Sequence, residues 1–327
     1  MSTEKRNENF MLKQSRYSKG KKNVKQYSKN NASKKSGSGK NSYNAYYKKN
    51  DDGFQPKSNG KSNYDKKKYP SKSKGYPKKN AQKPSIKIAF LGGLNEIGKN
   101  ITLVECENDI VIIDCGMAFP DGDMLGVDLV IPDFTYIEQN ADRVKGIILT
   151  HGHEDHIGGL PFLLSKVNVP IYGTPLTLGL VGNKLKEHSL YNQSQLNVIN
   201  AGQSIKLGCM KINFIHVNHS IPDAVAFAIH TPGGTIVHTG DFKIDCTPIT
   251  GDMIDLSSFA RVGDEGVLAL LSESTNAERP GYTPTERTVS DSLDNLFKSA
   301  ENYRIIIATF ASNVNRVQQI IDCAEKY

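Results

Sequence analysis

The sequence predicts an α/β protein whose core is a sheet-rich sandwich, and three observations lead to that class. Short β-rich runs dominate the chain from Ser85 onward. Helix-like stretches come only after several such runs, at about residues 157–167 and 175–188, which disfavours a regular βαβ repeat. Residues 1–84 show no apolar period and could not bury enough apolar surface to offset the entropy lost on ordering. We therefore expect a disordered tail followed by a folded core.

The tail, residues 1–84, is strongly basic. It holds 22 Lys and 2 Arg against 5 acidic residues, a net charge of +19, whereas the rest of the chain carries −12. Eight of the 14 Tyr also lie in it. Cations with interleaved aromatic rings suit single-stranded nucleic acid, through phosphate neutralisation and base stacking. A solubilising tail without a specific partner is the alternative that composition leaves open.

The folded part begins near Ser85 with apolar and β-branched runs separated by polar turns. The strands expected from these runs are 85–92, 101–106, 110–114, 146–150, 212–217, 224–231, 235–239 and 267–271.

The segment 91–100, LGGLNEIGKN, nearly matches the phosphate-binding pattern G-x-x-x-x-G-K-[ST]. Asn100 stands where that pattern needs a hydroxyl, and a strand follows it instead of a helix. A phosphate cradle of this kind depends on the helix N-terminus behind it. We therefore predict a hairpin-like turn between the first two strands.

A second α/β unit is predicted after Ser274. Thr283-Pro284-Thr285-Glu286 resembles a capping box with Pro at the first helical position, and it predicts a helix that ends near Ala300. Residues 304–310, RIIIATF, predict a buried parallel strand, and residues 312–326 predict a further helix. One strand and two helices cannot close a core, so the unit is barely begun at Tyr327. The apolar face expected on the last helix consists of Val314, Val317, Ile320 and Ile321.

Membrane and disulfide-rich secreted classes are disfavoured. No apolar run is long enough to cross a bilayer, and the N-terminus has no signal-peptide core. The five cysteines are scattered and lack C-x-x-C spacing, which predicts reduced thiols in a cytosolic protein. They are Cys106, Cys115, Cys209, Cys246 and Cys323.

The densest cluster of reactive side chains lies at residues 149–159, LTHGHEDHIGG, between an apolar strand and a helix. His151 and His153 alternate along one extended stretch, so both can point the same way. Asp155 and His156 lie at the start of the helix and can reach a second point nearby. Imidazole nitrogen and carboxylate oxygen are ligands of borderline metals such as Zn²⁺. A solvated polar loop is the alternative, but three of the chain's eight His within six residues favour a metal site.

Further ligands are expected at other strand ends. The candidates are His219 in VNHSIPD, Asp241 in HTGDFK and Asp114 in VIIDCG. Each alone is a weak signal, because an Asp that ends a strand is more often a turn former.

Together these motifs resemble the metallo-β-lactamase superfamily, whose pattern runs Asp, H-x-H-x-D-H, His, Asp. More closely, residues 87–327 resemble the ribonuclease J family of its β-CASP branch. The resemblance implies an αββα sandwich over 85–271 and the beginning of a β-CASP α/β domain over 272–327. The segments that carry it are GGLNEIGKN, IDCGMAFPDGDMLGVDLVIPDF, LTHGHEDHIGGLPFLL, VNHSIPDA, HTGDFKID, ESTNAERPGYTPTER and IATFASNVNRVQQII.

The resemblance also implies roles for individual residues. His151, His153 and His219 would bind one metal, Asp155 and His156 the second, and Asp241 would bridge both. Asp114 would orient a ligand His, and Glu273 in the β-CASP acidic motif would support the site. Asp155, His156 and Glu273 are the implied catalytic residues. The resemblance implies substrate contacts for Lys99, Asn95, Ser312, Asn313 and Arg316. At position 315 the chain departs from the family, because Asn315 stands where the family commonly has His. The resemblance assigns no metal-ligand role to His188, His216, His230 or His238.

The activity implied by the resemblance is hydrolysis of RNA phosphodiesters, both 5′–3′ exonucleolytic and endonucleolytic, in mRNA decay and rRNA maturation in the cytoplasm. Two divalent metals are implied, with Zn²⁺ favoured by the donor set and Mn²⁺ or Mg²⁺ as alternatives. The implied partners are single-stranded RNA with a 5′-monophosphate and further subunits, in a homodimer, a homotetramer or an assembly with a paralogue. Since the remaining family motifs would lie beyond residue 327, we expect these 327 residues alone to bind metal weakly and cleave RNA poorly.

The sequence leaves two other functions open. A small-molecule hydrolase of the same superfamily, such as a lactonase or thioesterase, would share the metal ligands. Only the segment from ESTNAERPGYTPTER onward and the basic tail separate it from a nuclease. A non-catalytic RNA-binding fragment is the second alternative.

The turn at 91–100 yields a first prediction. In the family this turn lies near the mouth of the metal site, so Lys99→Ala in the full-length protein should weaken RNA binding. Fluorescence anisotropy with labelled RNA would measure the change, and an unaltered affinity would exclude a role for this lysine.

Overall fold

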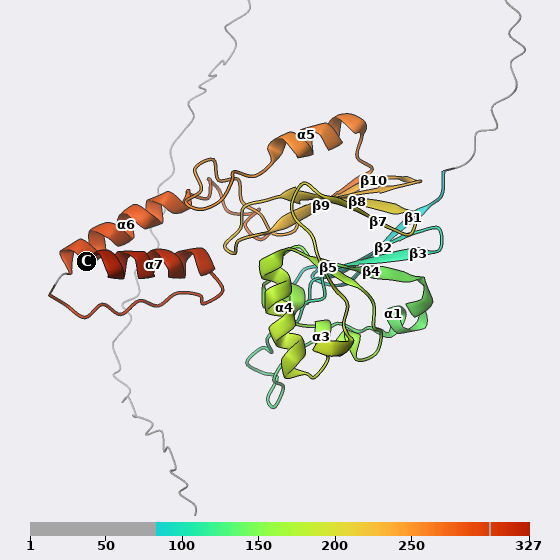
Figure 1. Ribbon diagram of the computed structural model, residues 1–327, viewed down its shortest axis with the longest axis horizontal. Helices are drawn as coiled ribbons and strands as arrows, with labels where there is room; N and C mark the ends of the chain where they lie inside the picture. Colours follow the sequence, from blue (N-terminus) through green and yellow to red (C-terminus); the bar gives the residue numbers. More distant parts are fainter. Residues whose placement is uncertain (1–82, 301) are drawn as a thin grey trace, which may run out of the picture. The chain divides into compact units, whose positions relative to one another are not determined.

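The computed structural model describes residues 83–300 and 302–327 (Figure 1). The predicted tail lies outside the described residues except for Lys83 and Pro84. None of the helices in the described ranges is long and apolar enough to cross a membrane.

Two β-sheets form the centre of the fold. The first is mixed: its β1–β2 and β2–β3 pairs are antiparallel, and β3 to β6 run parallel. The second is antiparallel except for the parallel pair β10–β11. In order, the first sheet is β1 (Ile86–Gly92), β2 (Ile101–Cys106), β3 (Asp109–Ile113), β4 (Val144–Ile148), β5 (Ile171–Gly173) and β6 (Leu196–Val198). The second is β11 (Ala269–Leu271), β10 (Gly234–His238), β9 (Val225–Thr231), β8 (Met210–His216) and β7 (Ser204–Leu207).

Helices cover the outer face of each sheet, so the layers run αββα, as predicted (Figure 1). On the first sheet lie α1 (Thr135–Gln139), η1 (Ala141–Arg143), α2 (Glu154–Ile157), α3 (Leu160–Leu164), α4 (Pro175–Glu187) and η2 (Tyr191–Gln193). The second sheet is covered by α5 (Leu256–Glu265).

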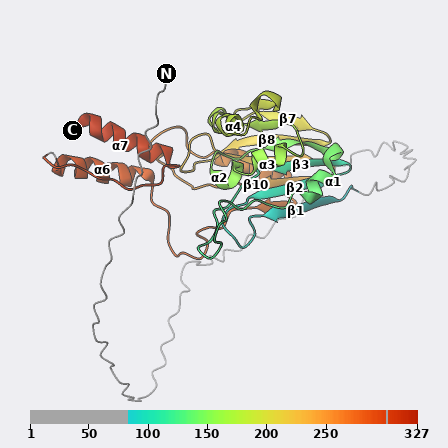
Figure 2. The same cartoon turned by 90° about the horizontal axis from the view of Figure 1, so that it is seen from below.

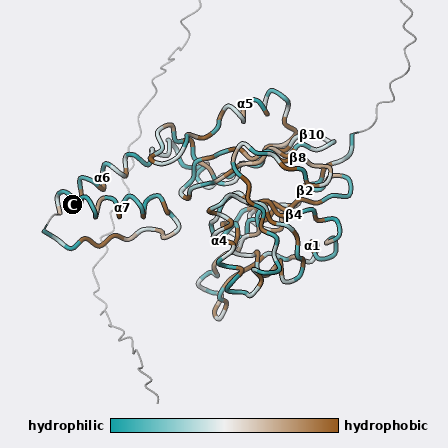
Figure 3. The backbone as a smooth tube through the Cα atoms, in the orientation of Figure 1, coloured by the Kyte–Doolittle hydropathy of each residue, from teal (hydrophilic) through white to brown (hydrophobic). Residues whose placement is uncertain are grey.

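The strand period of two explains why the sandwich has several apolar layers. In β3, Ile110 and Ile112 pack under the helices, whereas Val111 and Ile113 face the second sheet. Strands buried on both faces read as apolar runs without alternation, which is why β2 and β4 are mostly hydrophobic (Figure 3).

After β11 the chain forms α6 (Glu286–Ser299) and α7 (Val314–Lys326), which pack against each other (Figure 2). Phe297 and Cys323 are buried in this pair. The start of α6 is tied to the loop after β10, because Asp245 accepts a hydrogen bond from the backbone N of Glu286 at 3.1 Å.

Several predicted boundaries were wrong. The expected helix at 157–167 is two short helices, α2 and α3, because Gly158 and Gly159 separate them. The helix predicted to begin at Pro284, with Thr283 as its cap, instead begins at Glu286 and is capped by Thr285, whose hydroxyl accepts from Arg287 N at 3.4 Å. The carboxylate of Glu286 binds Arg316 at 2.8 Å and does not close a capping box.

The buried strand predicted at 304–310 is also wrong. These residues belong to neither sheet, and Ile306 and Phe310 are 90% and 84% exposed. A strand needs a neighbour for its backbone groups, and neither described sheet reaches this segment. The face predicted on α7 was wrong in part, since Val314 and Ile321 are exposed and it is Gln319 and Cys323 that are buried.

The packing between the sheets predicts a large cost for truncating a central side chain. Phe227 is fully buried and packs edge-to-face on Phe214, with ring centroids 5.4 Å apart. We expect Phe227→Ala to lower the free energy of unfolding by about 3–5 kcal/mol. Phe119→Ala, at a side chain that is 73% exposed, is the matched control and should change it by less than about 0.5 kcal/mol. Urea unfolding followed by circular dichroism measures both; equal effects would contradict this packing.

Candidate metal centre

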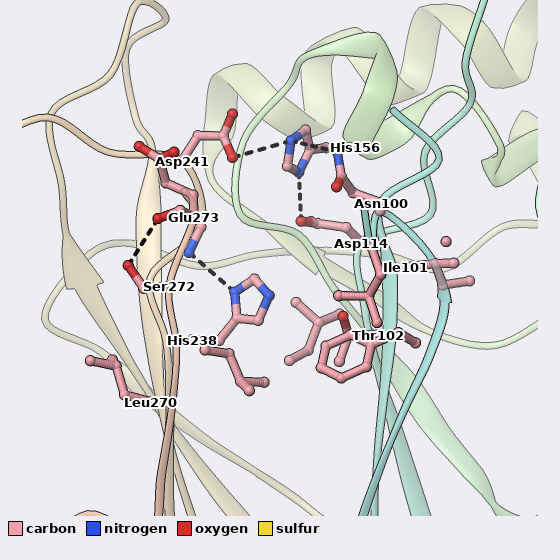
Figure 4. Close-up of a pocket in the computed structure, with 17 residues that line it drawn as sticks. Asn100, Ile101, Thr102, Asp114, His156, His238, Asp241, Leu270, Ser272 and Glu273 are labelled. Carbon is pink, nitrogen blue, oxygen red and sulfur yellow. Dashed lines mark hydrogen bonds and ion pairs between the residues drawn. The ribbon is translucent and has the colours of Figure 1, made fainter. Parts of the chain in front are cut away.

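The candidate site lies where strands of both sheets end (Figure 4). Asp114 follows β3 and the segment His151–His156 follows β4, both in the first sheet. In the second sheet, His219 follows β8 and Asp241 follows β10. The structure thus brings together side chains that are far apart in sequence.

Three histidines form the first donor group. Nε2 of His151 lies 3.0 Å from Nδ1 of His153, and Nε2 of His219 lies 3.2 Å from the same atom. These nitrogens lie within 4.8 Å of one another, close enough to share one ion. His151 is fully buried, and the other two are partly buried.

His151, His156 and Asp241 form the second donor group. One oxygen of Asp241 lies 3.5 Å from Nε2 of His156, and the other lies 3.8 Å from Nε2 of His219. Asp241 therefore faces both groups, as a bridging carboxylate must. Asp155 lies at the edge of the second group, with Oδ2 3.5 Å from Nε2 of His156.

Hydrogen bonds behind the histidines leave the converging nitrogens free to bind a cation. Nδ1–H of His151 can donate to Thr150 Oγ1 at 3.0 Å, and Nδ1–H of His156 to Asp114 Oδ2 at 2.8 Å. Nε2–H of His153 can donate to the carbonyl of Ser312 at 3.4 Å. In the neutral form of each ring, which is the form that binds a metal, these bonds place the proton away from the site and the lone pair toward it. The donor set therefore fits a divalent metal.

Asp114 is held by its own hydrogen bonds. Its carboxylate accepts from the backbone N of Thr150 at 2.8 Å and from the Thr150 hydroxyl at 2.7 Å, in addition to His156. Only 2% of its surface is exposed. This arrangement suits the predicted role in orienting a ligand histidine.

Burial and neighbouring charges shift the pKa values of the side chains in this site. Burial lowers the pKa of His151 and His153, and lowers that of His219 to about 4, so these rings are neutral near pH 7. Burial alone would raise the pKa of Asp241, but hydrogen bonding and charge from His156 bring it to about 2. For His156, burial lowers the pKa, but Asp114 and Asp241 outweigh it and raise the pKa well above its usual value.

Glu273 follows β11 beside the centre. Its Oε2 accepts from Thr275 N at 2.8 Å, and it lines a cavity of about 330 Å³ together with Asp114, His156 and Asp241 (Figure 4). It therefore borders the second donor group, although its side chain forms no hydrogen bond with a histidine in the described part of the chain.

Most of the residues predicted to contact substrate have partners within the protein. Lys99 pairs with Glu96 at 3.0 Å, whereas Asn95 is exposed. Arg316 binds Glu286, and the side chain of Asn313 caps α7 by accepting from Arg316 N at 3.1 Å. Ser312 meets His153 through its carbonyl, and Asn315 accepts a hydrogen bond from Thr250 at 3.1 Å. Their contacts with substrate stay predictions.

Sequence reasoning missed Asn100, Thr150 and His238. Asn100 contacts Asp155 and His156, and Thr150 bonds both Asp114 and His151. His238 lines the cavity and its Nδ1 accepts from Gly240 N at 3.1 Å. Asn100 and Thr150 each lie in a motif that the sequence analysis had identified, so the motifs could have pointed to them. For His238 the sequence gives no indication beyond its position at the end of β10.

Comparison with known proteins agrees with this geometry. The family model for the metallo-beta-lactamase superfamily matches residues 94–282. More than half of the chain is matched, so the chain belongs to the metallo-beta-lactamase superfamily. A crystal structure of a protein of unknown function from Enterococcus faecalis V583 has the same fold, with a TM-score of 0.56, 18% identity, and coverage of 73% of this chain and 63% of that one.

Curated relatives narrow the family. Ribonuclease J2 of Bacillus subtilis is 47% identical over 247 residues, which cover 76% of this chain and 44% of the relative. Ribonuclease J 1 of Streptococcus pyogenes is 48% identical over 241 residues, or 74% of this chain and 43% of the relative. Within the superfamily, the chain is a member of the ribonuclease J family. It spans less than half the length of these relatives.

The lowered pKa of His219 predicts a pH dependence of stability. The unfolded histidine titrates near pH 6.5 and the folded one at about 4, so between these values the unfolded state binds more protons. The stabilisation is complete above about pH 6.5 and is lost as the pH falls toward about 4. His219→Asn should therefore flatten this slope by up to about 1.4 kcal/mol per pH unit. Urea unfolding in EDTA from pH 4.5 to 7.5 measures it, and a slope equal to wild type would contradict the assignment.

Proposed function

We propose that the chain is part of a metal-dependent ribonuclease that hydrolyses RNA phosphodiesters. The observation that carries the proposal is the pair of donor groups that share His151 and are joined by Asp241. The names of the curated relatives, each a ribonuclease J, supply the substrate class. Because the chain covers less than half the length of each relative, RNA cleavage is proposed for this chain and not taken over from the relatives as an established activity.

The first group, His151, His153 and His219, would hold one ion. Asp155 and His156 would hold the second, with Asp241 between the two. Neutral imidazoles and carboxylates favour Zn²⁺, with Mn²⁺ or Mg²⁺ as alternatives. When bound, such ions polarise a phosphoryl oxygen and make a water molecule more acidic.

The protein's own groups would position the reactants. Asp155 has a partly exposed carboxylate next to His156, where it can accept the proton of the attacking water. Water attacks phosphorus in line, the bond from phosphorus to the 3′ oxygen breaks, and that oxygen takes a proton from solvent. The products are a free 3′-hydroxyl and a 5′-phosphate, and no 2′-hydroxyl attack or cyclic intermediate is needed. Glu273 would support the loop that borders the same cavity.

The finer features of the proposal follow the family resemblance. They are single-stranded RNA with a 5′-monophosphate as substrate, exonucleolytic and endonucleolytic cleavage in RNA decay and maturation, a cytoplasmic location and a homo-oligomeric or paralogue-containing assembly. The division into a metallo-β-lactamase part, 85–271, and the beginning of a β-CASP part, 272–327, is proposed on the same basis. A lactonase or thioesterase is disfavoured, because the relatives at 46–48% identity are ribonucleases J.

The test combines metal dependence with one ligand substitution. The 327-residue chain, loaded with Zn²⁺ or Mn²⁺, is incubated with a labelled single-stranded RNA that carries a 5′-monophosphate. We expect slow cleavage that EDTA abolishes and products that end in 5′-phosphates. Asp241→Asn should lower the rate by at least about 100-fold, since replacing even the partners of metal ligands costs 10–100-fold.

Asp223→Asn is the matched control. Asp223 is exposed and has φ +64°, a conformation that Asn tolerates well, and it lies outside both donor groups. This variant should cleave RNA like wild type. Cleavage that survives EDTA, or that Asp241→Asn leaves intact, would overturn the proposal; turnover of lactones or thioesters without RNA cleavage would favour the rival class.

A further inference from the structure

Asn100 ends the segment LGGLNEIGKN, and its side chain reaches the second donor group (Figure 4). The turn at 93–100 joins β1 to β2, and no helix follows it, so this residue has no part in a phosphate-binding loop. Its position in the motif therefore needs another explanation.

The carboxamide nitrogen of Asn100 lies next to two of the proposed metal-binding atoms. Nδ2 is 3.1 Å from Nε2 of His156 and 3.3 Å from Oδ2 of Asp155, and those two atoms are 3.5 Å apart. An amide NH₂ can only donate hydrogen bonds. It therefore donates to a carboxylate oxygen of Asp155, and it donates to His156 when Nε2 of that ring is unprotonated, which is the form that binds a cation.

Backbone contacts fix Asn100 in that place. Its N and its Nδ2 both donate to the carbonyl of Asp155, at 3.0 and 3.1 Å, and its own carbonyl accepts from Gly116 N at 2.9 Å. A Cβ on Gly116 would lie only 1.6 Å from the Asp155 carbonyl, so this close approach requires glycine. A Cβ on Gly93 would lie 2.5 Å from Oδ1 of Asn100, so the other side of the carboxamide is enclosed as well.

The helix that carries Asp155 and His156 needs such external support. α2 is only four residues long and has no side-chain hydrogen bond at its N-cap. Its first turn is held by bonds from other segments, namely Asn100 N to Asp155 O, Cys115 N to His156 O and Met117 N to Glu154 O. Asn100 is the member of this set that also contacts the side chains.

We propose that Asn100 is a positioning residue for the second metal: its carboxamide holds Asp155 and His156 in their binding orientation before the ion arrives. Among the described residues, the side-chain hydrogen bonds of Asn100 reach no atom of His151, His153 or His219, so the first ion should not depend on it. This inference rests on the proposed metal centre but not on the cleavage of RNA.

Titration with Co²⁺, followed by its visible absorption, tests the inference on the 327-residue chain. The spectrum distinguishes ions by their coordination, and isothermal calorimetry with Zn²⁺ gives the stoichiometry. We expect Asn100→Ala to weaken the second binding event by 10–100-fold while the first stays within about twofold of wild type. Asn183→Ala, at an exposed position of α4, is the control and should leave both events unchanged.

Asn100→Asp provides an independent test, because this variant should bind Zn²⁺ more strongly where Asn100→Ala binds it more weakly. A carboxylate at this position cannot donate to Asp155 and would repel its carboxylate, a loss that attraction to His156 offsets only in part, so the melting temperature in EDTA should fall. The added negative charge should then make the stabilisation by Zn²⁺ larger than in wild type.

The outcomes separate the inference from the metal proposal. If wild type binds two ions and Asn100→Ala binds both equally well, the role of Asn100 is overturned and the centre stands. Tighter binding of the second ion by Asn100→Ala would also overturn it, because the carboxamide would then compete with the ion. If wild type binds no ion, the metal centre itself fails and the inference with it.

Discussion

The buried carboxylate of Asp114 is the group on which the arrangement of the site depends. It follows β3, has φ +59°, and accepts hydrogen bonds from the Thr150 backbone, the Thr150 hydroxyl and His156. A buried charge is tolerated only when it is paired in this way. Because β3 and β4 are parallel neighbours, their carboxyl ends meet at one edge of the sheet, and Asp114 locks that junction. The orientation of His156, and through Thr150 that of His151, follows from it.

The second sheet supplies the other half of the centre, so the site is a product of the sandwich itself. His219 and Asp241 reach the histidines of the first sheet only because the apolar layer around Phe214 and Phe227 fixes the spacing between the sheets. Because both sheets contribute ligand side chains, a bound ion would connect the two sheets. Metal affinity and folding stability are then linked quantities, since ligands from two layers converge only in the folded chain.

The parts of the fold and of the metal centre that depend on local sequence rules could be predicted. The β-rich run ITLVEC at 101–106 is an inner strand, and the density of His and Asp at 151–156 by itself indicated where the donor groups lie. Predictions failed where the outcome depends on distant partners. Residues 304–310 have the composition of a buried strand but no neighbouring strand in the described ranges, and the start of α6 is set by Asp245 from another loop. Asn100 was missed because its partners lie 55 and 56 positions away.

Charge places a further constraint on any function that involves RNA. Residues 85–327 carry a net charge of −12, which on balance repels a polyanion. Two partly exposed cations predicted to contact substrate are already paired, Lys99 with Glu96 and Arg316 with Glu286. Attraction must then come from groups with uncompensated positive charge. Two bound divalent ions would supply it at the scissile phosphate under the proposed function, and residues 1–84, with a net charge of +19, are the other part of the sequence with a large positive excess. Bound metal would thus place positive charge at the site in a part of the chain whose net charge is negative.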